Sequence, residues 1–269
     1  MSRVDDVFAR LRTAGERALL PYFVAGDPSL DVTRLLVMEA ARRGADVIEL
    51  GVPFSDPIAD GPVIQRAGKR ALRTGVSLMR VLETVVELRR EIDTPIVLML
   101  YYNPILAFGL RAFAETATKA GVDGVIVPDL PPEEAAPFEA EATPVGLDIV
   151  YMVAPTSTPA RMRMISRRSR GFVYVVSLTG VTGERRELPS NLADQIRKLR
   201  AVTTKPLCVG FGISQPAHAE AVGRLADGVA VGSAIVRLVE ERAGSASLVH
   251  DVGDFIASLK EPLRRVATR

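Results

Sequence analysis

Short apolar runs alternate regularly with longer amphipathic stretches along this chain, and this pattern limits the folds open to it. The runs are rich in Val, Ile and Leu and are mostly apolar throughout, which is typical of parallel strands covered on both faces. The stretches between them have the apolar spacing of helices. We count eight strand candidates, which are Leu19–Ala25, Val47–Gly51, Pro95–Tyr102, Gly124–Val127, Asp148–Val153, Phe172–Val176, Pro206–Gly210 and Gly228–Val231.

Eight β/α units in 269 residues predict a closed (β/α)8 barrel, the TIM barrel fold. An open doubly wound sheet is the alternative, because strand counts from one sequence carry error. No Ser/Gly tract, charge block or composition break marks a linker, so we expect one domain over residues 1–269. An extra helix over Val4–Ala14 precedes the first strand and is expected to close the barrel floor. In such barrels the chemistry lies where strands end and the following loops begin.

Composition points to no charged macromolecular partner. The formal net charge is +2, from 34 basic and 32 acidic residues, which does not favour a nucleic-acid or membrane surface. The basic run Arg161–Arg170 is interpreted as a solvated helix face, with an anion-binding patch as the alternative. The N-terminus has no signal-peptide pattern and no segment approaches ~18 consecutive apolar residues, so we expect a soluble cytoplasmic protein. The single Cys208 lies in an apolar run and is expected to fill the core.

The stretch IELGVPFSDPIADGP, from Ile48 to Pro62, places Glu49 inside an otherwise apolar strand. Strand residues alternate between faces, so Val47, Glu49 and Gly51 share one face. If that face lines the barrel interior, burial raises the pKa of Glu49 and suits it to give and accept a proton near neutral pH. A structural carboxylate paired with a buried Arg or with backbone amides is the alternative.

Two further acids lie in the loop after this strand. Asp60 adjoins a Gly and a Pro, and we expect this stiff turn to direct its carboxylate back toward the barrel mouth. Asp56 is interpreted as capping its own turn through backbone N–H groups.

Glycine-containing segments follow the sixth, seventh and eighth strands, with the sequences SLTGVTGERRELPS, GFGIS and VGSAIV. Backbone N–H groups in such loops close around anions, and a helix that opens at Ser233 favours phosphate at its positive end. The last βα loops of this fold are a recurrent phosphate site. We therefore predict a phosphate-bearing ligand.

Missing groups narrow the chemistry further. No lysine lies at the carboxyl end of a strand, so no amine is placed for a Schiff base. His218 and His250 lie in helical patterns, so no metal site is predicted. With Schiff-base and metal chemistry excluded, we expect carboxylates to act on a substrate that is held by its phosphate. Three tyrosines lie near strand ends, namely Tyr22, Tyr102 and Tyr174. Each, taken alone, is interpreted as packing in the core or at the rim of the barrel.

Six motifs together resemble the tryptophan synthase alpha subunit family: ELGVPFSDPIADGPVIQRA, GVDGVIVPDLPPEEAAPF, APTST, YVVSLTGVTG, VGFGIS and DGVAVGSAIV. They lie in the family's order and spacing between about Phe8 and Glu240. The first motif is highly specific, whereas the glycine loops alone indicate only a phosphate-binding barrel. The resemblance implies a lyase that cleaves indole-3-glycerol phosphate to indole and glyceraldehyde 3-phosphate in a retro-aldol reaction.

The resemblance also implies a role for individual residues. Glu49 would protonate the indole ring at the carbon that loses its side chain, and Asp60 would accept a hydrogen bond from the indole N–H. Tyr174 would support the site, and Thr182 would pack on Asp60 when the site closes. The implied phosphate-binding positions are Gly183, Gly212, Gly232 and Ser233. The implied walls of the indole pocket are Tyr22, Leu100, Tyr102 and Phe211.

A partner is implied as well. The family assembles with a beta subunit in an α2β2 complex, and that subunit carries pyridoxal phosphate and converts indole to tryptophan. The resemblance therefore implies no cofactor and no metal in this chain. The residues implied at the subunit interface are Pro53, Asp56, Pro57, Asn103 and Pro104.

The chain departs from the family pattern in two places that concern the site. Position 22 is Tyr where Phe also occurs, and the closing loop over residues 177–189 carries the charged run ERREL. Another phosphate-binding barrel, such as a sugar-phosphate epimerase or a thiamine-phosphate synthase, is the nearest enzymatic alternative. A non-catalytic barrel that scaffolds a beta subunit is the alternative from another class.

Overall fold

A computed structural model describes residues 2–176, 191–210 and 212–264. Within these residues nine strands form one parallel sheet, with the strand order β5-β4-β3-β2-β1-β9-β8-β7-β6. The strands are β1 Ala18–Val24, β2 Ile48–Gly51, β3 Ile96–Met99, β4 Gly124–Ile126, β5 Asp148–Val150, β6 Met152–Val153, β7 Val173–Val176, β8 Leu207–Gly210 and β9 Gly228–Val231.

The sheet closes into a barrel, because its two ends are consecutive in the chain. Only Tyr151 separates β5 from β6, and its backbone N–H donates to Ser169 Oγ at 3.0 Å. The Tyr151 carbonyl accepts from the N–H of Tyr174 on β7 at 3.1 Å, so pairing continues across the break. The predicted (β/α)8 barrel is therefore confirmed, with its fifth strand divided in two, and the open-sheet alternative is wrong.

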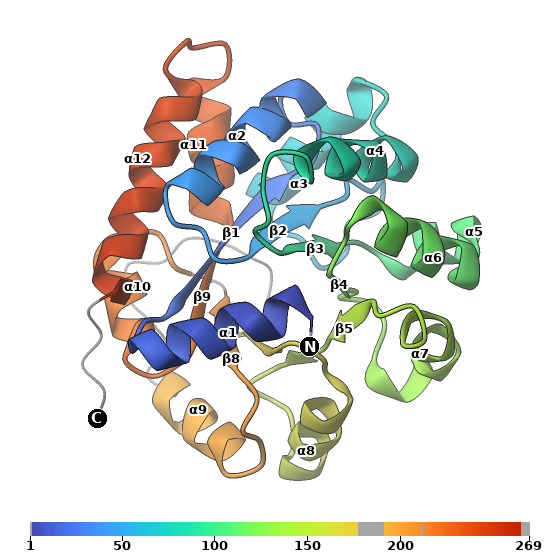
Figure 1. The fold of residues 1–269 in the computed structure, drawn as a ribbon, viewed down its shortest axis with the longest axis vertical. Coiled ribbons are helices and arrows are strands. Elements are labelled where there is room, and N and C mark those ends of the chain that lie inside the picture. Colours follow the sequence, from blue (N-terminus) through green and yellow to red (C-terminus); the bar gives the residue numbers. More distant parts are fainter. Residues whose placement is uncertain (1, 177–190, 211, 265–269) are drawn as a thin grey trace.

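Helices surround this barrel, and Figure 1 shows them outside the strands, whereas α1 lies across the strands in this view. No helix in the described residues is long and apolar enough to cross a membrane. Two short 3-10 helices, Pro132–Glu134 and Glu261–Arg264, complete the helical elements of the described part of the chain. The α-helices described there are α1 Arg3–Ala14, α2 Leu30–Arg42, α3 Pro62–Arg73, α4 Leu78–Leu88, α5 Tyr102–Phe108, α6 Leu110–Ala120, α7 Ala136–Ala142, α8 Pro159–Arg168, α9 Leu192–Arg200, α10 Pro216–Gly223, α11 Ser233–Arg242 and α12 Leu248–Lys260.

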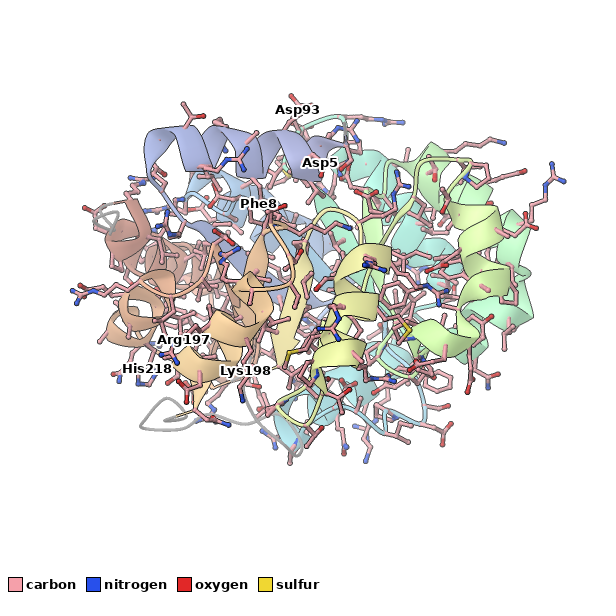
Figure 2. The ribbon with its side chains drawn as sticks, turned by 90° about the horizontal axis from the view of Figure 1, so that it is seen from below. Asp5, Phe8, Asp93, Arg197, Lys198 and His218 are labelled. Carbon is pink, nitrogen blue, oxygen red and sulfur yellow. The ribbon has the colours of Figure 1, made fainter. Side chains whose placement is uncertain are left out.

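The apolar core has two layers. Strand residues that point outward, such as Ile48 and Leu50, pack beneath the helices, whereas Val47 belongs to the cluster inside the barrel. The face of β2 that carries Val47 and Glu49 therefore lines the barrel interior. At the floor, Phe8 of α1 joins this inner cluster and its ring lies 5.8 Å from that of Phe172. Figure 2 shows Phe8 extending from α1 toward the strands, so the prediction that this helix closes the floor is confirmed.

Buried aspartates hold the strands in register at the floor. Asp46, just before β2, accepts from the N–H of Leu19 on β1 at 2.9 Å and pairs with Lys260 at 2.8 Å. Asp123, just before β4, accepts from the N–H of Ile96 at 2.8 Å and also pairs with Arg89. Each carboxylate thus meets a backbone donor and a cation. This end of the barrel is fixed, so the opposite strand ends are presented on a rigid base.

Candidate active site

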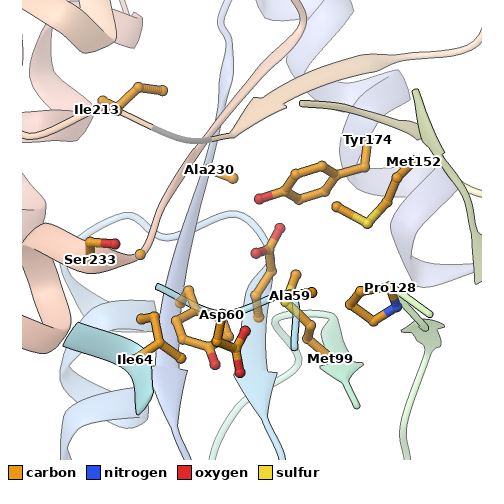
Figure 3. A pocket seen from close by; sticks show the side chains of 14 residues that line it. Ala59, Asp60, Ile64, Met99, Pro128, Met152, Tyr174, Ile213, Ala230 and Ser233 are labelled. Carbon is orange, nitrogen blue, oxygen red and sulfur yellow. The ribbon is translucent and has the colours of Figure 1, made fainter. Parts of the chain in front are cut away.

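A cavity opens at the carboxyl ends of the strands, and Figure 3 shows side chains that surround it. Its empty volume is about 670 Å³, including the part that opens to solvent. Most of the lining is apolar and includes Ile64, Met99, Pro128, Met152 and Ile213. The polar side chains at the cavity are Tyr22, Glu49, Asp60, Tyr174 and Ser233.

Glu49 lies in the middle of β2, in register with Tyr22 on β1 and Val97 on β3. Its side chain is buried, with 1% of the residue exposed, and Oε1 meets no hydrogen-bond partner among the described residues. Burial raises the pKa of Glu49 to about 8, because the charged form loses its hydration without compensation. The carboxyl group is therefore protonated at neutral pH and able to donate its proton to a bound ligand.

Asp60 is held in the loop between β2 and α3 by two contacts. The hydroxyl of Tyr101 hydrogen-bonds its carboxylate and also accepts from the N–H of Ala59 at 2.9 Å. The Gln65 side chain donates to the Asp60 carbonyl at 2.9 Å. Burial raises the pKa of Asp60 to about 6, and the Tyr101 hydroxyl opposes that rise. At neutral pH the cavity therefore holds one protonated and one ionised carboxyl group, which suits paired acid and base roles.

Two buried tyrosines complete the polar wall. Burial raises the pKa of Tyr22 and of Tyr174 well above the ordinary value, so both remain neutral phenols. Each ring lies against a glycine of the neighbouring strand. A Cβ atom on Gly51 would lie 2.1 Å from Tyr22 Oη, and one on Gly210 would lie 2.1 Å from Tyr174 Oη. Glycine at these two positions is what admits the phenols to the cavity.

The opposite side of the cavity is suited to an anion. Helix α11 begins at Ser233, directly after Gly232, and no side chain caps its first turn. Both residues line the cavity, together with Gly212, whose φ of 81° is in the left-handed region that favours glycine. Helix N-termini attract anions through exposed N–H groups and the helix dipole. Figure 3 shows Ser233 across the cavity from Tyr174.

Two predicted wall residues do not line this cavity. Leu100 is buried in the cluster between strands and helices, and the ring of Tyr102 packs against Phe138 at 6.4 Å outside the barrel. The neighbouring residues Met99 and Tyr101 take the inward positions instead. The resemblance placed Leu100 and Tyr102 there, but side chains alternate from inward Val97, so Met99 faces inward and Leu100 outward; β3 itself ends at Met99 and not at Tyr102 as predicted. Inward Val97 is the signal that fixes the correct phase.

The remaining predicted residues fall into two groups. Thr182, Gly183 and Phe211 lie outside the described residues. Asp56 and Asn103 line a second hollow beside the cavity, where the exposed apolar side chains of Ile58 and Leu106 also lie. The other interface residues predicted from the sequence sit in the same two segments and are Pro53, Pro57 and Pro104.

Asp56 does not cap its turn. Its carboxylate accepts a hydrogen bond from the Ser55 hydroxyl and is otherwise exposed to solvent. The predicted backbone cap is wrong, because the side chain points out of the loop and leaves the turn N–H groups to the main chain, as in the bond from the N–H of Ile58 to the Asp56 carbonyl at 2.9 Å. This leaves an exposed acid beside the second hollow.

Other sequence features lie away from the cavity. Cys208 is buried inside the barrel floor cluster, and the two histidines lie on α10 and α12. No group of three metal-binding side chains occurs in the described part of the chain. In the basic run, Arg161 pairs with Glu133 and Arg168 with Glu139, so these two arginines meet acids of the same chain.

Known proteins with the same features were found by sequence and by structure. The family model described as tryptophan synthase alpha chain matches residues 8–262. The tryptophan synthase alpha chain of Geobacter sp. (strain M21) is 48% identical over 261 residues, which cover 97% of each chain. The crystal structure of tryptophan synthase subunit alpha from Legionella pneumophila str. Paris is 38% identical, with a TM-score of 0.91 over 98% of each chain.

One chain of a solved complex is similar too. The tryptophan synthase complex from Pyrococcus furiosus contains a chain that is 38% identical, with a TM-score of 0.84 over 91% of this chain and 98% of that one. Since the family model and the relatives cover nearly the whole sequence, the chain belongs to the tryptophan synthase alpha chain family.

Proposed function

We propose that the cavity cleaves indole-3-glycerol phosphate to indole and glyceraldehyde 3-phosphate, the lyase reaction of its family. The observation that carries this assignment is the protonated, unpartnered carboxyl group of Glu49 in an apolar cavity. A flat aromatic ring fits between apolar walls, and a phosphate fits the uncapped start of α11 at the other end.

In the proposed reaction Glu49 donates its proton to the ring carbon that bears the glycerol phosphate side chain. Positive charge then develops toward the ring nitrogen, and ionised Asp60 stabilises it through a hydrogen bond from the N–H. The bond between the ring carbon and the side chain breaks, and its electron pair returns to the ring. The adjacent hydroxyl becomes the aldehyde by giving its proton to the Glu49 carboxylate, which restores the starting state.

The other cavity residues bind and orient the substrate in this proposal. Tyr22, Met99 and Tyr174 contact the ring, and Tyr101 holds Asp60. Phosphate binding is assigned to Gly212, Gly232 and Ser233 among the described residues, and to Gly183 beyond them. Thr182 and Phe211 are assigned to the closing loop and the ring pocket.

We further propose that a beta subunit docks over the second hollow. Exposed Ile58 and Leu106, which are 78% and 49% exposed, offer apolar contact there, and Asp56 and Asn103 offer polar contact. The proposed contact also includes Pro53, Pro57 and Pro104. In this arrangement an α2β2 complex in the cytoplasm passes indole to the partner, which holds pyridoxal phosphate, and this chain needs no cofactor.

The test is indole release from indole-3-glycerol phosphate by the purified chain, with and without a beta subunit. We expect slow release by the chain alone, faster release with the beta subunit, and loss of both after Glu49→Gln. A folded protein that releases no indole under either condition would reject the lyase assignment and leave a scaffold for the beta subunit.

A further inference from the structure

Two helices carry the two ends of the cavity. Asp60 lies two residues before α3, the Gln65 side chain of α3 holds its carbonyl, and Ile64 of the same helix lines the cavity. Gly232 and Ser233 place the start of α11 at the anion end. The relative position of α3 and α11 therefore sets the distance between the ring end and the anion end.

Charged side chains join these helices away from the cavity. Arg70 of α3 donates to Glu240 of α11 at 2.6 Å, and Arg66 donates to both oxygens of Glu240 at 3.0 and 2.8 Å. Arg70 also donates to both oxygens of Asp27, in the loop after β1, at 2.8 and 2.7 Å. We call these four side chains the α3–α11 clamp.

The clamp is partly buried and geometrically demanding. Asp27 is 4% exposed, and the side chains of Arg70 and Glu240 are 30% and 28% exposed. A guanidinium that binds a carboxylate with two parallel hydrogen bonds fixes direction as well as distance. The Arg66 and Arg70 guanidinium groups lower the pKa of Glu240 to about 2, so the clamp stays charged across the working pH range.

None of the four side chains lines the cavity. Glu240 is seven residues beyond Ser233, about 10 Å along the helix axis. We propose that Glu240 is a positioning residue, which acts through α11 and α3 to set the spacing between the phosphate site and Asp60. The inference rests on the proposed function, because only a substrate that spans both ends senses this spacing. A shift of about 1 Å at a reacting group is enough to slow a reaction strongly.

The test compares Glu240→Ala with Glu115→Ala in the full chain. Glu240→Ala breaks the link between the helices and leaves the buried Arg70–Asp27 pair intact. Glu115→Ala removes a similarly accessible acid whose ion pair, with Arg111, lies within a single helix. Indole release gives kcat and KM, and calorimetry gives the affinities for indole and for glycerol 3-phosphate, each of which occupies one end.

For Glu240→Ala we expect kcat to fall about tenfold while KM and both fragment affinities change less than about threefold, since each end stays intact and only their spacing changes. Glu240→Gln keeps an acceptor for one guanidinium and should recover part of kcat. Glu115→Ala should match the wild type.

Two results would overturn the inference. One is a kcat for Glu240→Ala equal to that of Glu115→Ala. The other is a parallel loss of fragment binding and turnover, which a general structural role would produce. The wild-type chain in the same assay separates these from failure of the proposed function: a wild type that releases no indole rejects the function, and the inference with it, whereas an active wild type leaves only the inference at stake.

Discussion

The two ends of the barrel both bury carboxylates, but they surround them differently. At the floor, Asp46 and Asp123 each accept a backbone N–H and meet a Lys or Arg. At the mouth, Glu49 is more deeply buried, yet its Oε1 has no hydrogen-bond partner among the described residues. The floor aspartates are thus compensated by their surroundings, whereas Glu49 is not.

Burial alone therefore does not distinguish the proposed catalytic acid from a structural carboxylate. A buried carboxylate with a cation and a backbone donor holds two strands together and has no spare capacity for a ligand. A buried carboxyl group without partners costs stability and keeps its proton until a substrate arrives. The partners around the group, and the end of the barrel at which it lies, decide which role it takes.

Substitution of Glu49, at the barrel mouth, should reduce activity more than any other change. Glu49→Gln keeps the shape of the side chain and removes the transferable proton, so we expect kcat to fall at least about a thousandfold, within the range for general acid–base catalysis. The change should leave the near-UV circular dichroism unaltered. Retention of more than a tenth of wild-type indole release would show that another group moves the proton.

The corresponding change at the floor should act on stability and not on chemistry. Asp123→Asn leaves Arg89, whose side chain is 12% exposed, without its anion, so we expect the free energy of unfolding to fall by about 2–4 kcal/mol. Urea unfolding measures this loss. Activity of the folded protein should stay within about twofold of wild type, and a large loss of kcat would break the division between the two ends.

The pH dependence of kcat/KM should reflect the pKa values of Glu49 and Asp60. The proposed reaction needs Asp60 ionised and Glu49 protonated, and their pKa values are raised to about 6 and about 8. We therefore expect kcat/KM to fall below about pH 6 and above about pH 8. In a variant that keeps measurable activity, Asp60→Glu for example, the acid limb should move and the alkaline limb should stay. A flat profile from pH 5 to 9 would contradict both assignments.

A smaller effect is expected at Tyr101 and not at the adjacent Tyr102. The Tyr101 hydroxyl lowers the pKa of Asp60, so Tyr101→Phe should raise that pKa and move the acid limb to higher pH. Tyr102→Phe is the matched control, because its ring packs on Phe138 outside the barrel. If the control moves the acid limb and Tyr101→Phe does not, the inward phase of β3 described above is wrong.

Much of the fold was predictable from sequence because apolar runs mark parallel strands strongly. The eighth predicted strand, Gly228–Val231, matches β9 at both ends. The end of β3 was not predictable in the same way. In LMLYYNP every residue up to Tyr102 suits a strand, so composition could not show that the chain turns into α5 at Tyr102.

The site residues, too, were predictable from sequence only in part. Glu49 stood out because an acid inside an apolar strand is rare, and its inward face followed from alternation. The floor aspartates follow the repeated pattern Gly-X-Asp before a strand, as in GAD and GVD, but their partners Lys260 and Arg89 are remote in sequence. The Tyr101 contact to Asp60 depends on two loops meeting, which only the fold determines.

Urea unfolding of Glu49→Gln and of wild type from pH 4.5 to 9 tests directly whether the Glu49 carboxyl group is left uncompensated in the folded protein. The pKa of Glu49 is about 8 in the folded protein against 4.5 in the unfolded chain, so between these values the folded wild type binds more protons than the unfolded chain and loses stability as pH rises. The variant lacks this group. We predict that its stability relative to wild type rises by about 4 kcal/mol across this range. A difference that stays constant with pH would show that the Glu49 carboxylate is compensated like those of the floor.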